Sequence, residues 1–113
     1  MDSKPSTAVR RSTRVPCEIP VTLTTLDAAH SFSRRGVVVL VNLQGCAARS
    51  PYPVAVGTAV RLEGLPSGKS ADARIVNCIS LGEHENLWLL GLALAVSENV
   101  WGIKNPPNDW TEP

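Results

Sequence analysis

Apolar and polar residues alternate with a period of two along most of the chain, which is the pattern of strands that bury one face. Between 19 and 24, for example, Ile19, Val21 and Leu23 alternate with polar neighbours. The same pattern, or a β-branched run, recurs at 37–42, 46–49, 58–63, 72–79 and 87–96. Hairpin-length turns separate these runs, so the sequence predicts a mainly all-β fold, a six-stranded antiparallel β-barrel.

The same alternation predicts which side chains face the core. We expect Ile19, Leu23, Ile75, Leu90 and Leu92 to be largely buried. In the fifth run, a strict period of two places Asn77 and Ile79 on the face of Ile75, with Val76 opposite. After the last strand, Pro106 and Pro107 exclude a long helix and favour a short irregular or helical C-terminal segment. Trp101 and Trp110 are expected to pin that segment onto the barrel, because an indole buries a large area.

Composition limits the size and the charge of the molecule. The 113 residues suit one domain, expected as a leader at 1–9, a barrel domain at 10–103 and a tail at 104–113. The polar leader offers little to bury, so we expect it to be mobile. Net charge is +1, but residues 1–35 carry +3 and the remainder −2. A small anion is therefore a better candidate partner than a long nucleic acid.

Several familiar signatures are missing from the sequence. Cys17, Cys46 and Cys78 form no Cys-x-x-Cys pair, and we expect free, buried thiols. The longest apolar run, 87–96, is too short for a membrane helix, which needs about 20 residues. With no secretory signal pattern, these features favour a cytoplasmic protein without membrane insertion.

No arrangement of residues points to catalysis. The segment 64–70 resembles a phosphate-binding loop, but its spacing is one residue short and it leads into a strand. We therefore expect a hairpin turn there. His30 and His84 lie in polar loops without a nucleophile or a motif around them. The sequence thus favours a protein that is not an enzyme and has no cofactor or metal.

The sharpest chemical signal is Arg10-x-x-x-Arg14, with Arg11 between, immediately before the first strand. Guanidinium groups bind phosphate oxygens and the O6/N7 edge of guanine in bidentate fashion, and their faces stack on purine rings. Two such groups four residues apart could hold a guanine nucleotide against the barrel wall. A solvated basic leader would explain the same residues.

These arginines before an alternating strand resemble the opening of PilZ domains, bacterial six-stranded barrels of which many bind cyclic di-GMP. The family's second motif, Asp/Asn-x-Ser-x-x-Gly, corresponds to Asn42-Leu43-Gln44-Gly45-Cys46-Ala47. The segments 56–62 and 90–94 are similar to later strands of the family, and the resemblance extends over residues 10–103. Strand order, spacing and both motif positions together make this resemblance fairly specific.

The resemblance implies a ligand site and also a weakness in it. Arg10 and Arg14 would take phosphates and guanine edges, Arg11 could help, and Asn42 with Gln44 would meet a base or a phosphate. Gln44 replaces the usual serine and Ala47 the usual glycine. One methyl group at a tight contact costs about 1–3 kcal/mol. Restoring both family residues, Gln44→Ser with Ala47→Gly, is then expected to tighten binding.

The sequence therefore predicts a non-enzymatic cyclic di-GMP receptor or adaptor, which would signal by contact with an unidentified protein partner. An alternative is a PilZ-like protein-interaction module that has lost the nucleotide. A third reading is a small nucleic-acid-binding β-barrel, disfavoured by the near-neutral net charge.

Overall fold

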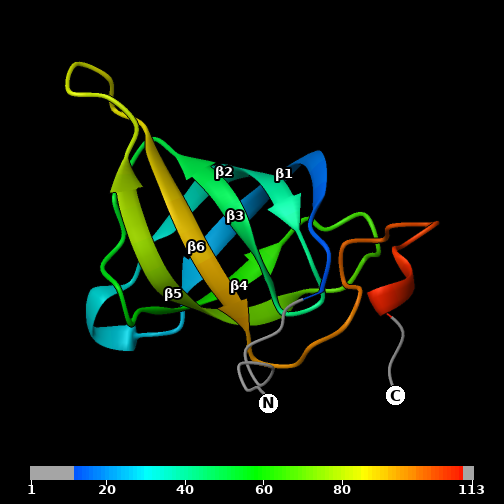
Figure 1. The fold of residues 1–113 in the computed structure, drawn as a ribbon. Helices are drawn as coiled ribbons and strands as arrows, with labels where there is room; N and C mark the ends of the chain where they lie inside the picture. Colours follow the sequence, from blue (N-terminus) through cyan, green and yellow to red (C-terminus); the bar gives the residue numbers. More distant parts are fainter. Residues whose placement is uncertain (1–11, 111–113) are drawn as a thin grey trace, which may run out of the picture.

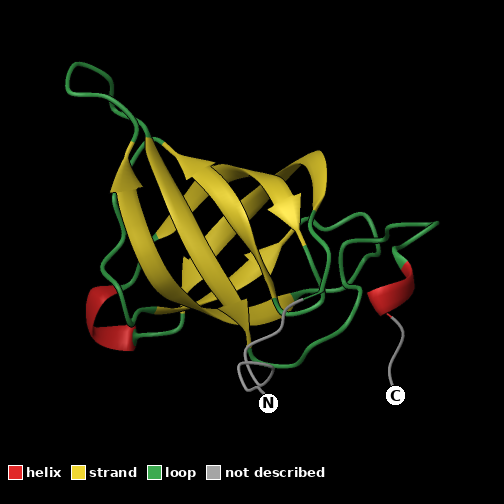
Figure 2. Cartoon of the chain, viewed as in Figure 1, coloured by secondary structure: helices red, strands yellow, loops and turns green. Residues whose placement is uncertain are grey.

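Six strands pair antiparallel into a closed barrel in the computed structural model, which describes residues 12–110 (Figures 1 and 2). The strands are β1 (Val15–Thr25), β2 (Ser33–Val41), β3 (Gly45–Ser50), β4 (Ala59–Glu63), β5 (Ala71–Ser80) and β6 (Trp88–Leu94). Their order around the barrel is β1-β2-β3-β6-β5-β4, and β4 pairs with β1 to close it. The predicted all-β barrel is confirmed. Two single-turn 3-10 helices, η2 (Ala28–His30) and η3 (Asn108–Trp110), complete the described chain.

The barrel interior is filled by the inward faces of the six strands. Ile19, Leu23, Ile75, Leu90 and Leu92 are all buried, as predicted. They belong to one continuous core that also includes side chains from β2 and β4. Each fully buried aliphatic side chain contributes about 1.5–3 kcal/mol relative to an exposed one. Alternation between buried and exposed positions is thus the main determinant of this fold.

The regular alternation of β5 is interrupted by a β-bulge. Ile75 pairs with Leu92 on β6, but the register shifts before Asn77, which pairs with Gly91. The extra residue reverses the alternation, so Cys78 takes the inward position opposite Leu90. Asn77 and Ile79 are exposed on the outer face. The prediction that they share the face of Ile75 is therefore wrong.

Two glycines, Gly45 and Gly68, occupy positions that favour glycine over other residues. A Cβ atom at Gly45 would overlap the carbonyl oxygen of Leu92 on β6. Glycine at this position lets β3 and β6 come together where both strands leave the barrel end. Between β4 and β5, Gly68 adopts a left-handed φ of 81° in a turn that joins the two paired strands. The segment 64–70 is therefore a hairpin turn, as predicted.

The C-terminal segment is attached to the barrel by its tryptophans. Trp101 is 1% exposed, and its indole Nε1 donates a 2.8 Å hydrogen bond to the Asn42 carbonyl oxygen. Trp110, in η3, is 5% exposed and donates through Nε1 to the Thr13 carbonyl oxygen at 2.7 Å. The predicted pinning of this segment is confirmed. Within residues 12–110, no helix has the length and apolar character needed to cross a membrane.

Candidate ligand-binding groove

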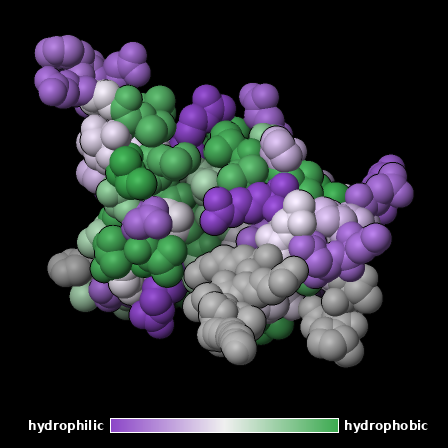
Figure 3. Space-filling view, viewed as in Figure 1, coloured by the Kyte–Doolittle hydropathy of each residue, from purple (hydrophilic) through white to green (hydrophobic). Residues whose placement is uncertain are grey.

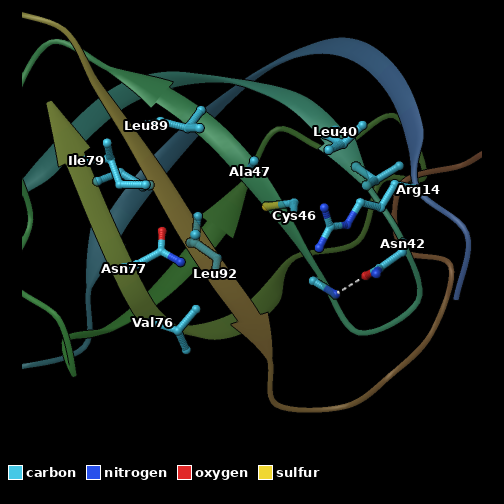
Figure 4. Close-up of a pocket in the computed structure, with 14 residues that line it drawn as sticks. Arg14, Leu40, Asn42, Cys46, Ala47, Val76, Asn77, Ile79, Leu89 and Leu92 are labelled. Atoms are coloured by element: carbon cyan, nitrogen blue, oxygen red, sulfur yellow. Dashed lines mark hydrogen bonds between the residues drawn. The ribbon is translucent and has the colours of Figure 1, made fainter. Parts of the chain in front are cut away.

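A groove of about 420 Å³ crosses the outer face of the barrel over β3, β6 and β5 (Figure 4). Its floor is a row of three paired residues, Ala47 on β3, Gly91 on β6 and Asn77 on β5. The row is low because alanine and glycine present almost no side chain. A Cβ atom at Gly91 would lie 2.7 Å from Oδ1 of Asn77, so the carboxamide occupies the space directly over that glycine. The volume falls within the range of about 300–1,000 Å³ typical of small-molecule sites.

The walls of the groove are mainly apolar. Leu40, Leu89, Val76 and Ile79 line it, and the last two are 48% and 52% exposed. Figure 3 shows hydrophobic side chains gathered over β3, β5 and β6 on this face. Surface of this kind favours contact with the planar or apolar part of a ligand.

Cys46, at the edge of the groove, adds to its apolar character. Burial, with a smaller contribution from the neighbouring Cys17, raises the pKa of the Cys46 thiol to about 12. The thiol is therefore uncharged at neutral pH and is a poor nucleophile. The Cys46 thiol therefore contributes apolar surface to the groove and not a reactive group.

Arg14 supplies the positive charge at the groove. It immediately precedes β1, is exposed, and extends its guanidinium group toward the groove (Figure 4). Its side chain makes no hydrogen bond or ion pair with any other residue of the 12–110 segment. All the guanidinium donors are therefore free to bind an anion or the edge of a base.

Asn42 organises the turn that leads from β2 to β3. Its side-chain Oδ1 accepts hydrogen bonds from the backbone N–H groups of Gln44 (3.0 Å) and Gly45 (2.9 Å). Its Nδ2 donates to the Ser12 carbonyl oxygen at 3.3 Å. The residue is buried, and this bonding is typical of an asparagine that closes a turn with its own side chain. Asn42 thus stabilises the turn at the rim of the groove through hydrogen bonds within the protein.

Gln44 lies beside the groove and holds the segment that precedes β1. Its Oε1 accepts hydrogen bonds from Oγ of Ser12 at 2.7 Å and from the Ser12 backbone N–H at 3.2 Å. The same Ser12 hydroxyl accepts from the Leu43 N–H at 2.9 Å. Ser12 is 8% exposed, so these bonds are shielded from water. The turn between β2 and β3 therefore anchors the chain two residues before Arg14.

The C-terminal segment holds the next residue of the same stretch. The backbone N–H of Thr13 donates to both carboxylate oxygens of Asp109, at 3.1 and 2.9 Å, and the Thr13 hydroxyl donates to Oδ2 at 2.8 Å. Trp110 donates to the Thr13 carbonyl oxygen, as described above. Residues 12–14, which we call the arm, are thus held between the β2–β3 turn and η3.

The predicted site residues are only partly gathered in one place. Arg14, Asn42 and Ala47 all line the groove, whereas Gln44 faces Ser12 beside it. Arg10 and Arg11 lie outside the described residues, as does the leader at 1–9.

Asn77 also lines the groove but is not among the site residues predicted from the sequence. The available signal was a polar residue between Val76 and Cys78, and the strict alternation assigned it to the wrong face.

Neither metal chemistry nor known relatives add a further clue. Among residues 12–110, no three or more His, Cys, Asp or Glu side chains are close enough to hold a metal ion. No protein-family model matches the sequence, and a search of curated proteins finds no match.

Proposed function

We propose that this chain is a non-enzymatic receptor for cyclic di-GMP, acting as a PilZ-like adaptor in bacterial cytoplasmic signalling. One observation carries the proposal. Arg14, from the first motif of the PilZ resemblance, lines the same groove as Asn42 and Ala47 from the second. These positions are about 30 residues apart in sequence, and only the barrel brings them together.

The chemistry of the groove suits a cyclic dinucleotide. The free guanidinium of Arg14 can donate paired hydrogen bonds to a phosphate or to O6 and N7 of guanine. Its planar face can stack on a purine ring. The shallow floor at Ala47 leaves room for a flat base between apolar walls. Binding then combines charge recognition at one end with ring contact along the floor.

Signal output follows from the position of Arg14 on the arm. A ligand that engages Arg14, together with Arg10 and Arg11, changes the surface that the protein presents beside the arm. A partner protein that binds the liganded surface better than the free one responds to the presence of the ligand.

Calorimetric titration with cyclic di-GMP tests the proposal, with GTP and GMP as control ligands. Arg14→Ala removes charge-assisted hydrogen bonds of about 1.5–3 kcal/mol, so affinity falls about tenfold to a hundredfold. Arg10→Ala has the same expected effect. Arg35→Ala is the matched control, because Arg35 is an exposed arginine on β2 outside the groove. Equal losses for Arg14→Ala and Arg35→Ala contradict the proposed site.

A protein-interaction module is the second candidate, supported by the exposed apolar side chains of β5 and the following turn. Val76, Ile79 and Leu81 are 48%, 52% and 43% exposed. This reading leads if the protein ignores cyclic di-GMP at millimolar concentration. A steep loss of oligonucleotide affinity with salt would instead favour the nucleic-acid reading.

A further inference from the structure

Asn77 is a polar side chain placed in the groove by the β5 bulge. The bulge turns it outward, into the same row as Ala47 and Gly91. Its carboxamide makes no hydrogen bond with any residue in the described part of the chain. The other carboxamide of the groove, that of Asn42, uses both its oxygen and its nitrogen within the protein. Asn77 is thus the groove's free amide.

The absence of a side chain at Gly91 leaves space for this amide close to the groove floor. Oδ1, Cγ and Nδ2 of Asn77 all lie 2.7–3.0 Å from where a Gly91 Cβ would be, so the carboxamide rests flat against the β6 backbone. Its polar atoms therefore lie over Gly91, in the row that leads across β6 to Ala47, and they remain exposed to a ligand. Figure 4 shows Asn77 on β5 and Arg14 before β1 on opposite sides of the β3 and β6 floor. A flat ring resting on Ala47 would meet Asn77 at its edge.

We infer that Asn77 is a specificity-determining residue of this groove, which hydrogen-bonds the edge of a purine base. The inference rests on the proposed function and names the residue that reads the base. A carboxamide both donates and accepts. It can donate to O6 and accept from N1–H of guanine, while the phosphates lie toward Arg14.

The hydrogen-bonding pattern yields a test of specificity. Adenine also presents a donor next to an acceptor, N6–H and N1, so a carboxamide can pair with either purine. A carboxylate only accepts, and it matches the adjacent N1–H and N2–H donors of guanine but not N1 of adenine. Asn77→Asp should therefore raise the preference for cyclic di-GMP over cyclic di-AMP. This preference is a ratio, so a general loss of stability or an overall electrostatic effect on the phosphates cancels from it.

The experiment measures the affinities of wild type, Asn77→Ala and Asn77→Asp for both dinucleotides by calorimetry. Asn77→Ala should lose about tenfold in cyclic di-GMP affinity, as expected for hydrogen bonds to a base edge. Asn77→Asp should increase the guanine-to-adenine ratio about tenfold or more. Asn105→Ala, at an exposed asparagine outside the groove, is the control and should change neither.

The outcomes separate this inference from the proposed function. If wild type binds cyclic di-GMP and Arg14→Ala weakens it, the function stands. An unchanged affinity in Asn77→Ala, or an unchanged ratio in Asn77→Asp, then overturns only the role of Asn77. If wild type binds neither dinucleotide at millimolar concentration, both the function and the inference are overturned.

Discussion

Gln44→Ser tests whether Gln44 acts on the ligand directly or through the arm. By resemblance, serine is the family residue at this position, and its restoration together with Ala47→Gly is expected to tighten binding. The structure points to the opposite result, because Oε1 of Gln44 accepts two hydrogen bonds from Ser12. The serine side chain is two bonds shorter and cannot reach Ser12 without movement of the turn. The arm would lose these two hydrogen bonds to the β2–β3 turn and keep only those that Asn42 and Leu43 donate to Ser12.

The size of the effect follows from the two lost hydrogen bonds. Each neutral hydrogen bond contributes about 0.5–1.5 kcal/mol, so the arm loses about 2 kcal/mol of anchoring. Arg14, two residues beyond Ser12, is then less well placed, and we expect about a tenfold loss of cyclic di-GMP affinity. Amide exchange at Ser12 and Leu43 should accelerate by a similar factor, since the Ser12 hydroxyl also holds the Leu43 N–H.

Gln44→Glu and Ser12→Ala isolate the interaction between Gln44 and Ser12, and Ala47→Gly tests the groove floor separately. Gln44→Glu keeps an acceptor oxygen at the same reach and should preserve protection of the Ser12 amide. A double-mutant cycle of Ser12→Ala with Gln44→Ser should give a coupling of about 1 kcal/mol or more. Ala47→Gly, made alone, removes a methyl group from the groove floor and should tighten binding modestly. If Gln44→Ser tightens binding and leaves Ser12 exchange unchanged, the arm-anchoring role of Gln44 is refuted.

Three other predictions concern stability and are checked by chemical denaturation. Gly45→Ala forces a methyl group onto a backbone carbonyl and should cost at least about 3 kcal/mol, whereas Gly82→Ala, with 3.7 Å to its nearest atom, should be close to neutral. Trp110→Phe removes the indole donor to Thr13 and should cost about 1 kcal/mol, with faster amide exchange at Thr13 while exchange within the barrel is unchanged. Because burial raises the pKa of the Cys46 thiol from 9.0 to about 12, folding disfavours the thiolate, and stability should fall as pH rises above 9. Between pH 8 and pH 10 this loss should be about 1 kcal/mol, and Cys46→Ala should reduce the slope; an unchanged slope in that variant would contradict the assignment.

The barrel could be predicted from sequence because its strands bury one face each. Apolar residues such as Leu23 and Leu90 occur at every second position of their strands, and these positions are buried in the structure. The hairpin turn around Gly68 was predictable for the same reason, since turn residues interrupt the period locally. These features depend only on neighbours in the chain.

The groove could be predicted only in part, because its decisive features depend on contacts that are not local. A bulge adds one residue without changing the composition of the strand, so strict alternation from Ile75 assigned Asn77 to the inner face. The role of Gln44 depends on Ser12, which is 32 residues away. The motif positions placed Arg14, Asn42 and Ala47 near one another, but the hydrogen bonds that occupy Asn42 required the folded turn.

Thr13 donates to Asp109 and accepts from Trp110, residues 96 and 97 positions further along, so the two ends of the described chain lie side by side. A circular permutant can exploit this closeness. A short Gly/Ser linker would connect the two ends, and new termini would be opened in the exposed hairpin at 82–86, between β5 and β6. All six strands keep their partners in such a permutant. A reporter attached at that hairpin would leave the arm covalently joined to the C-terminal segment that holds it, which includes Asp109 and Trp110.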